Sequence, residues 1–161
     1  MLEIIQEVLT SNNSISKLIL MPTPDFETKI HLRSAHSDGA VSVVELAASP
    51  DFAGPPLHHH DFDEAFYVLE GELTFQLGDE LRTAGAGELI FAPRGSHHTL
   101  ANLSGAPARY LVVCTPAGFE NRFARTAAER AGLDAPDWAL EPYPETHFVG
   151  PRIGERDDVQ P

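Results

Sequence analysis

The feature that most constrains this chain is a run of three histidines, His58-His59-His60, just ahead of a strand-like segment. Successive side chains of an extended strand point to opposite faces, so His58 and His60 face one way and His59 faces the other. Glu64 follows after a short bend. Two imidazoles and a carboxylate are most of a divalent-metal site. The pattern therefore raises two questions. One is whether the chain holds a further metal ligand, and the other is whether its fold encloses such a metal site.

Short strand-like runs separated by turn residues fill residues 28–116. Leu73, Phe75 and Leu77 show clear strand alternation, and Gly and Pro residues mark the turns. This spacing of short strands and turns predicts an all-β fold, either an antiparallel sandwich or a barrel. The expected strands cover residues 29–33, 41–47, 64–69, 72–77, 80–83, 88–92, 98–102 and 108–115.

The segments on either side of the strands differ in character. Residues 1–27 form an apolar N-terminal arm in which 2–9 suggest a short amphipathic helix and 15–21 favour a strand. Residues 117–133 contain apolar residues at helical spacing, which predicts a helix near 118–131 that ends at Gly132 and packs outside the barrel. Residues 134–161 read as a Pro- and acid-rich tail, partly held by Trp138, Tyr143 and Phe148, with a mobile end from Gly154.

Composition narrows the class of protein. A length of 161 residues fits one domain, and the net charge of -13 disfavours nucleic acid and anionic membranes as partners. The sequence has neither the pattern of a signal peptide nor an apolar run of membrane-spanning length, so we expect a cytoplasmic protein. The single cysteine, Cys114, lies in an apolar run and is expected to be a small buried hydrophobe.

A second motif supplies the missing ligand. Pro93 and Gly95 form a turn after the strand near 88–92, and His98 is then placed at the start of the returning strand. The pattern G-x5-P-x-G-x2-H-x3-N is met in full, with Gly87 at its start and Asn102 at its end.

The chain resembles the cupin family. Its first motif, H-x-H-x3-E-x6-G, is met by His58, His60, Glu64 and Gly71, and the second motif follows after a short spacer. Gly54 departs from the family pattern, because it precedes His58 by four positions rather than six. The resemblance implies a cupin double-stranded β-helix, or jelly roll, with an N-terminal arm and a C-terminal helix.

The resemblance also implies that His58, His60, Glu64 and His98 converge on a metal inside the barrel. Three imidazoles and a carboxylate suit Fe, Mn, Ni, Cu or Zn, and an octahedral ion would keep about two open positions. Glu64 is a candidate catalytic base if it leaves the metal, and a plain ligand otherwise. A metal-free histidine cluster is the competing interpretation.

Other side chains are candidates for the surroundings of the site. His59 is expected outside the pocket and His97 at its mouth, whereas His31, His36 and His147 are expected to be lone residues. Strand parity places several apolar or amide side chains inward, where some would contact a planar or acyl ligand. The candidates for this substrate-binding role are Phe66, Phe75, Phe91, Leu100 and Asn102.

Within the cupins, residues 63–73 and 115–120 are similar to small quercetinase-like proteins. That resemblance implies a metal-dependent dioxygenase acting on a small enolisable or aromatic molecule. The alternatives are a metal-dependent isomerase, a non-catalytic ligand-binding or sensor protein, and a storage or structural protein. The apolar arm further predicts a homodimer in which the arm crosses to its partner.

Overall fold

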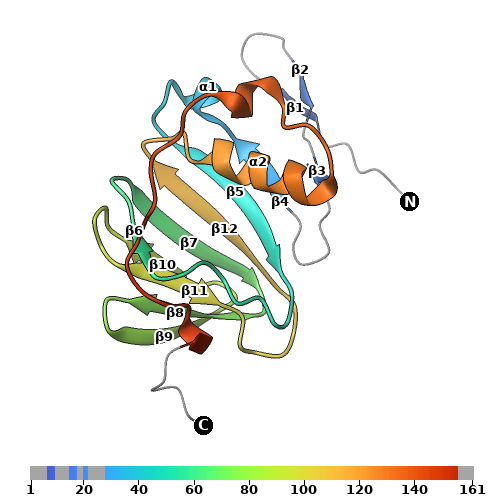
Figure 1. Cartoon of the computed structure of the whole chain (residues 1–161). Helices are drawn as coiled ribbons and strands as arrows, with labels where there is room; N and C mark the ends of the chain where they lie inside the picture. The colour runs from blue at the N-terminus through green and yellow to red at the C-terminus, as the bar shows by residue number, and fades with distance from the viewer. Residues whose placement is uncertain (1–6, 10–14, 18–19, 22–27, 156–161) are drawn as a thin grey trace.

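The computed structural model describes residues 7–9, 15–17, 20–21 and 28–155. Two antiparallel sheets face each other in a jelly-roll barrel, as the sequence predicts (Figure 1). The first sheet has the order β10 (Leu89–Ala92), β7 (Asp63–Glu70), β12 (Ala108–Thr115), β5 (Ser42–Ala48), β4 (Thr28–Leu32) and β3 (Leu20–Met21). The second has the order β13 (His147–Phe148), β6 (His58–His59), β11 (His98–Ala101), β8 (Glu72–Leu77) and β9 (Glu80–Gly85).

The core lies between the sheets because each strand has one apolar face. β5 and β12 alternate between buried and partly exposed residues along their whole length. From the first sheet, Val44 and Val112 point inward, and Leu73, Phe75 and Leu100 meet them from the second. Full burial of each large apolar side chain contributes about 1.5–3 kcal/mol, so this core stabilises the barrel.

The loop before β6 packs directly against β11. Gly54 has φ +69°, and a Cβ added there would lie 1.7 Å from the carbonyl oxygen of Leu100. The Asn102 N–H donates to the carbonyl of Phe52 at 2.8 Å, which ties the same loop to the end of β11. Only glycine fits at position 54, because the backbone of Leu100 lies so close. This holds although the spacing between Gly54 and His58 departs from the family motif.

Helix α2 (Glu120–Ala131) ends as predicted at Gly132, whose left-handed backbone (φ 66°) lets its N–H bond to the last turn. The helix contacts β3, β4 and β5 and also the 3-10 helix η1 (Asp137–Leu140). Phe119, just before the helix, is buried in the barrel core. Phe123, within the helix, packs against the same core, so α2 is anchored to the interior of the barrel.

The arm differs from its prediction. Within 2–9, residues Glu7–Leu9 form strand β1, which pairs with β2 (Ile15–Lys17), so the expected helix is wrong for this part. Backbone pairing between the two strands outweighs the weak helical pattern, and residues 2–6 lie outside the described part. Strand β3 pairs with β4 of the same chain.

A short helix α1 (Ser34–Ser37) lies between β4 and β5. After α2, the tail runs along one side of the barrel to η2 (Ile153–Glu155), drawn in red in Figure 1. Trp138 lies under the Arg33 guanidinium at 4.5 Å and Tyr143 under that of Arg125 at 4.9 Å, so both side chains hold the tail as expected. Gly154 belongs to η2, and residues 156–161 lie outside the described part.

No helix in the described part of the chain is long and apolar enough to cross a membrane.

Candidate metal centre and its cavity

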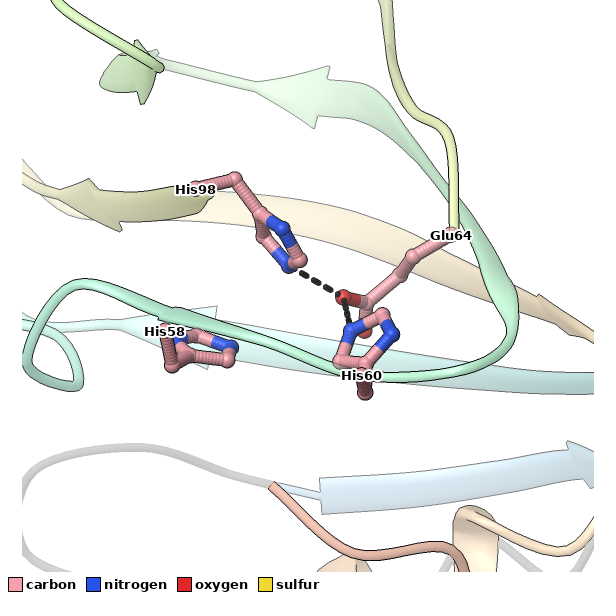
Figure 2. A group of neighbouring side chains, drawn as sticks. All are labelled: His58, His60, Glu64 and His98. Atoms are coloured by element: carbon pink, nitrogen blue, oxygen red, sulfur yellow. Dashed lines mark hydrogen bonds and ion pairs between the residues drawn. The ribbon is translucent and has the colours of Figure 1, made fainter. Parts of the chain in front are cut away.

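The four predicted ligands come together from both sheets (Figure 2). His58 and His98 are direct partners across β6 and β11. Glu64 comes from β7 in the opposite sheet, and His60 lies in the connection between β6 and β7. All four residues are buried, and their ligand atoms lie within 4.8 Å of one another. The strand parity that places His58 and His60 inside is confirmed by their burial.

Each imidazole is oriented by a backbone carbonyl two residues away. The Nδ1 atoms lie 2.8 Å from Pro56 O for His58, 2.9 Å from Phe62 O for His60 and 3.0 Å from Ser96 O for His98. A carbonyl oxygen only accepts hydrogen bonds, so each Nδ1 carries the proton. A ring that is protonated only at Nδ1 presents the lone pair of Nε2 to the centre of the site, as a metal ligand must.

The centre requires a cation. Oε2 of Glu64 lies 2.9 Å from Nε2 of His60 and 3.0 Å from Nε2 of His98 (dashed lines in Figure 2). Lone pairs on two neutral rings would face a carboxylate oxygen at these distances and repel it. Protons on both rings, or one divalent metal among the ligands, remove this conflict. The donor set therefore fits a metal of the first transition row, without selecting one.

The protonation states favour metal binding at neutral pH. Burial, reinforced by the neighbouring His98, lowers the pKa of His58 from 6.5 to about 4, so this ring is neutral. Burial alone would raise the pKa of Glu64. When Nε2 of His60 and of His98 each donates a hydrogen bond to the carboxylate, as in the metal-free site, these bonds outweigh burial and lower this pKa to about 2, so the carboxylate is ionised. A metal thus finds ligands that need not first release a proton at these two positions.

The turn of the second motif is fixed to the ligands of the first. The Gly95 N–H donates to the His60 carbonyl at 2.8 Å. Arg94 donates to Asp63 through its backbone N–H at 2.9 Å and its side chain at 2.7 Å. These bonds hold the turn against the start of β7, beside Glu64, and so set the relative position of the two motifs.

Two buried side chains beside Glu64 were not expected as part of the site. Cys114 lies with its Sγ 3.9 Å from Oε1 of Glu64, and burial together with that carboxylate raises the pKa of the thiol. Cys114 is therefore a buried, protonated thiol, in agreement with its reading as a small hydrophobe. Tyr110 is also buried, and burial and the Glu64 charge raise the pKa of its phenol. Its inward parity on β12 was the signal available in the sequence.

Three other histidines, His59, His97 and His147, form a separate group away from the metal ligands. The ring of His59 stacks between His97, at 5.4 Å, and His147, at 5.0 Å between ring centroids. The outward orientation of His59 is thus confirmed. His147 is not a lone residue, because β13 pairs with β6 and places it opposite His59. His97 belongs to this stack and does not line the cavity described next.

A cavity of about 440 Å³ adjoins the ligands. His58 and Glu64 form part of its wall, and the rest comes from both sheets, α2, the loop before β6 and the tail. Phe148 lines it from β13, and its ring lies 6.0 Å from that of His58. The contribution of the tail was missed in the sequence because a two-residue strand leaves no alternating pattern.

The five predicted pocket residues divide into two groups. Phe66 and Leu100 line the cavity. Phe75 is buried but packs behind Phe66, with 5.3 Å between the ring centroids. Phe91 does not face the interior, because Ile90 and Ala92 take the inward positions of β10 and leave Phe91 51% exposed. Asn102 lies beyond the end of β11, and its side-chain amide donates at 2.8 Å to the carbonyls of Ser49 and Ala106, which is a structural role.

Residues 44–114 match the family model of the cupin domain. This match includes all four ligands and both motifs, on a barrel of the expected topology. The similarity to the cupin domain thus extends over residues 44–114. The cupin segment spans β5 to β12, so the arm, α2 and the tail are additions that surround it.

Comparison with other proteins supports this cupin fold. The chain is 24% identical to a predicted oxalate decarboxylase from Thermotoga maritima (56% of this chain, 80% of that one, TM-score 0.52). It is 23% identical to the polyketide cyclase RemF from Streptomyces resistomycificus (71% and 79%, TM-score 0.51). KdgF from Halomonas sp. is 21% identical (58% and 80%, TM-score 0.51). At this identity the likeness concerns the fold alone.

One curated relative matches in sequence. The protein named endoribonuclease YbeY from Myxococcus xanthus is 33% identical over 81 residues, which cover 50% of this chain. The matched segment spans only 27% of that protein, about a quarter of its length. Its name therefore describes a much longer protein than the segment shared with this cupin domain.

Proposed function

We propose that this cupin is a metal-dependent enzyme of the dioxygenase type, similar to quercetinases, that acts on a small enolisable or aromatic molecule. The observation that carries the proposal is the cavity of about 440 Å³ that opens directly onto His58 and Glu64. A ligand in this cavity would contact two of the four metal ligands at once. Its mainly apolar wall suits a planar molecule.

His58, His60, Glu64 and His98 would hold the metal, which supplies Lewis-acid stabilisation of an enolate oxygen and open coordination positions. Glu64 is ionised at neutral pH and lines the cavity, so it can accept the proton of an enol hydroxyl. Burial then favours the neutral carboxyl that results. Tyr110 stays protonated and lines the cavity, so its hydroxyl can donate a hydrogen bond to an oxygen of the bound molecule.

A non-catalytic ligand-binding or sensor protein is the second candidate. With its pKa lowered to about 2 in the metal-free site, the Glu64 carboxylate is a weak base. A site that only captured a ligand would not need a stronger one. A metal-dependent isomerase would use the same residues to move a proton without consuming oxygen.

The deciding experiment measures oxygen consumption and product formation after the protein is loaded in turn with Fe, Mn, Ni, Cu and Zn. Enolisable aromatic compounds such as flavonols serve as substrates. We expect consumption that is lost in His98→Ala and kept in His97→Ala, with both variants folded. Saturable binding without any reaction would favour the sensor, and a product formed without oxygen uptake would favour the isomerase.

We further propose that the protein is a cytoplasmic homodimer. We also propose that it binds a small molecule and neither nucleic acid nor a membrane. The net charge of -13 disfavours nucleic acid and anionic membranes as partners. Tyr67 lies opposite Leu89 on neighbouring strands of the first sheet, and both are exposed beside Phe91. An exposed apolar group of this kind is typical of an interface.

A further inference from the structure

The charges around the cavity are unlike those of the rest of the molecule. The chain carries 24 acidic residues and 11 Lys and Arg. The cavity nevertheless has one carboxylate in its wall, that of Glu64, and three arginines, Arg122, Arg130 and Arg152. Positive side chains of this acidic protein are thus concentrated around a cavity that reaches the candidate metal centre.

Helix α2 presents two of these arginines on one face. Arg122, Thr126 and Arg130 follow one another at intervals of four residues, and all three line the cavity. The Arg122 guanidinium lies 5.3 Å from the centroid of the Phe119 ring, which is an apolar support for a planar cation. Within the described part of the chain, Arg122 forms no ion pair with a carboxylate. Its hydrogen-bonding edge is thus available to a ligand.

Arg152 is held in place from the opposite side by the chain itself. Its Nε donates to the Gly54 carbonyl at 3.0 Å, and its NH1 pairs with Glu155 at 2.9 Å. Arg152 therefore closes the loop before β6 against the tail, and its charge is partly balanced. Arg122 is the better candidate for direct contact with an anion.

We propose that the cavity selects a carboxylate-bearing ligand, with the carboxylate against Arg122 and an enol or phenol oxygen toward His58 and Glu64. The inference rests on the proposed function for the position of the oxygen end. The apolar walls between the two ends, which include Phe66, Leu100 and Phe123, fit a planar hydrocarbon body. A guanidinium matches a carboxylate through two parallel hydrogen bonds, which an ammonium ion does not.

The arginines also offset the repulsion between this acidic protein and an anionic ligand. A net charge of -13 repels an anion at long range, so an acidic ligand enters only where local charge reverses the field. A cluster of arginines at a partly enclosed cavity has this effect, because its low-dielectric walls strengthen the interaction. A neutral ligand would need no such cluster.

The test compares two probes with the same enol head, 3-hydroxyflavone and its 4′-carboxylate, by fluorescence titration. The protein is loaded with zinc, which has no redox chemistry, so binding is measured without turnover. We expect the carboxylate to bind at least about tenfold more tightly, and higher salt to reduce this preference. In Arg122→Gln the preference should disappear while the affinity for 3-hydroxyflavone stays the same. In Arg122→Lys it should be reduced.

Arg109→Gln is the matched control, because it makes the same charge change on the outer surface, where Arg109 pairs with Glu45 and Glu70. It should keep the preference. Equal affinity of wild-type protein for both probes, or binding of neither, overturns the inference. If the preference is present and no substrate consumes oxygen, the proposed enzyme function fails and the inference stands.

Discussion

Phe148 lies directly opposite His58 in the antiparallel pair of β13 and β6, with 6.0 Å between the centroids of their rings. The side chain is 55% exposed, yet it forms part of the cavity wall beside a metal ligand. Two backbone hydrogen bonds support this position, because the N–H groups of Val149 and Gly150 both donate to the Leu57 carbonyl, at 2.8 and 3.2 Å. A segment from the end of the chain thus completes a site built in the middle.

Phe148→Ala should weaken binding of 3-hydroxyflavone by roughly tenfold, because an aromatic wall is lost, and should leave the metal content unchanged. Fluorescence titration and elemental analysis check the two parts. Phe91→Ala is the matched control, since Phe91 is 51% exposed but sits on the outer face of β10. Equal losses of affinity in the two variants would contradict the role of Phe148.

His98→Ala should lower metal affinity by more than about 100-fold, because even the outer partners of metal ligands contribute 10- to 100-fold. His97→Ala, one residue away, should retain the metal, since its ring stacks on His59 outside the barrel. Competition titration with a chromophoric chelator measures both affinities. A retained metal in His98→Ala would show that the four-residue site is not the one that binds.

The metal-free protein should lose stability as the pH falls from about 6.5 to about 4. His58 takes up a proton near pH 6.5 in the unfolded chain but only near pH 4 in the folded one. The unfolded state therefore binds more protons in this range, and the free energy of unfolding decreases by at most about 3 kcal/mol. Urea unfolding at several pH values measures the slope. His58→Asn should flatten it, and an unchanged slope would rule out His58 as its source.

Gly54→Ala should destabilise the protein by roughly 3 kcal/mol or more, because the new Cβ would meet the Leu100 carbonyl in a left-handed conformation. Gly87→Ala tests the backbone contribution alone. Gly87 also has a positive φ, +88°, but no atom lies within 4 Å of an added Cβ, so the cost should be about 1 kcal/mol. Thermal or urea unfolding compares the two, and similar losses would show that the contact with β11 is unimportant.

The proposed homodimer has a direct test. Light scattering coupled to size exclusion should give twice the 17.5 kDa mass of one chain. Leu89→Lys should shift the protein toward the monomer, because a charge at an apolar interface is costly to bury. Leu81→Lys, at an exposed leucine on β9 of the other sheet, should not. A monomeric wild-type protein would refute the proposal.

The strands and ligands followed from the sequence where local patterns were strong. Strand β12 has the predicted bounds, because the mainly apolar run at residues 110–114 lies between a turn and Pro116 and leaves little freedom. The helix ends at the predicted glycine for a similar reason. Phe91 was misplaced because Leu89, Ile90, Phe91 and Ala92 are all apolar, so the sequence contains no alternation to set the inward parity.

The remaining parts of the site depend on contacts between distant segments. β13 is two residues long, and its partner β6 is farther away in the sequence than the whole length of the segment that matches the cupin model. The cationic face of α2 is visible in the sequence as Arg122 and Arg130, but its orientation toward the cavity is decided by packing of Phe119 into the core. Strand pairing and helix orientation of this kind are set by tertiary contacts, so no local sequence pattern predicts them.

The pairing of β6 on both edges has a consequence for the order of synthesis. One partner, β11, emerges soon after β6, whereas the other, β13, is among the last described segments to leave the ribosome. A nascent chain that has already gathered all four ligands still has an open edge at His58 and a cavity without its Phe148 wall. The four ligands therefore do not depend on the tail, whereas the cavity wall beside His58 does.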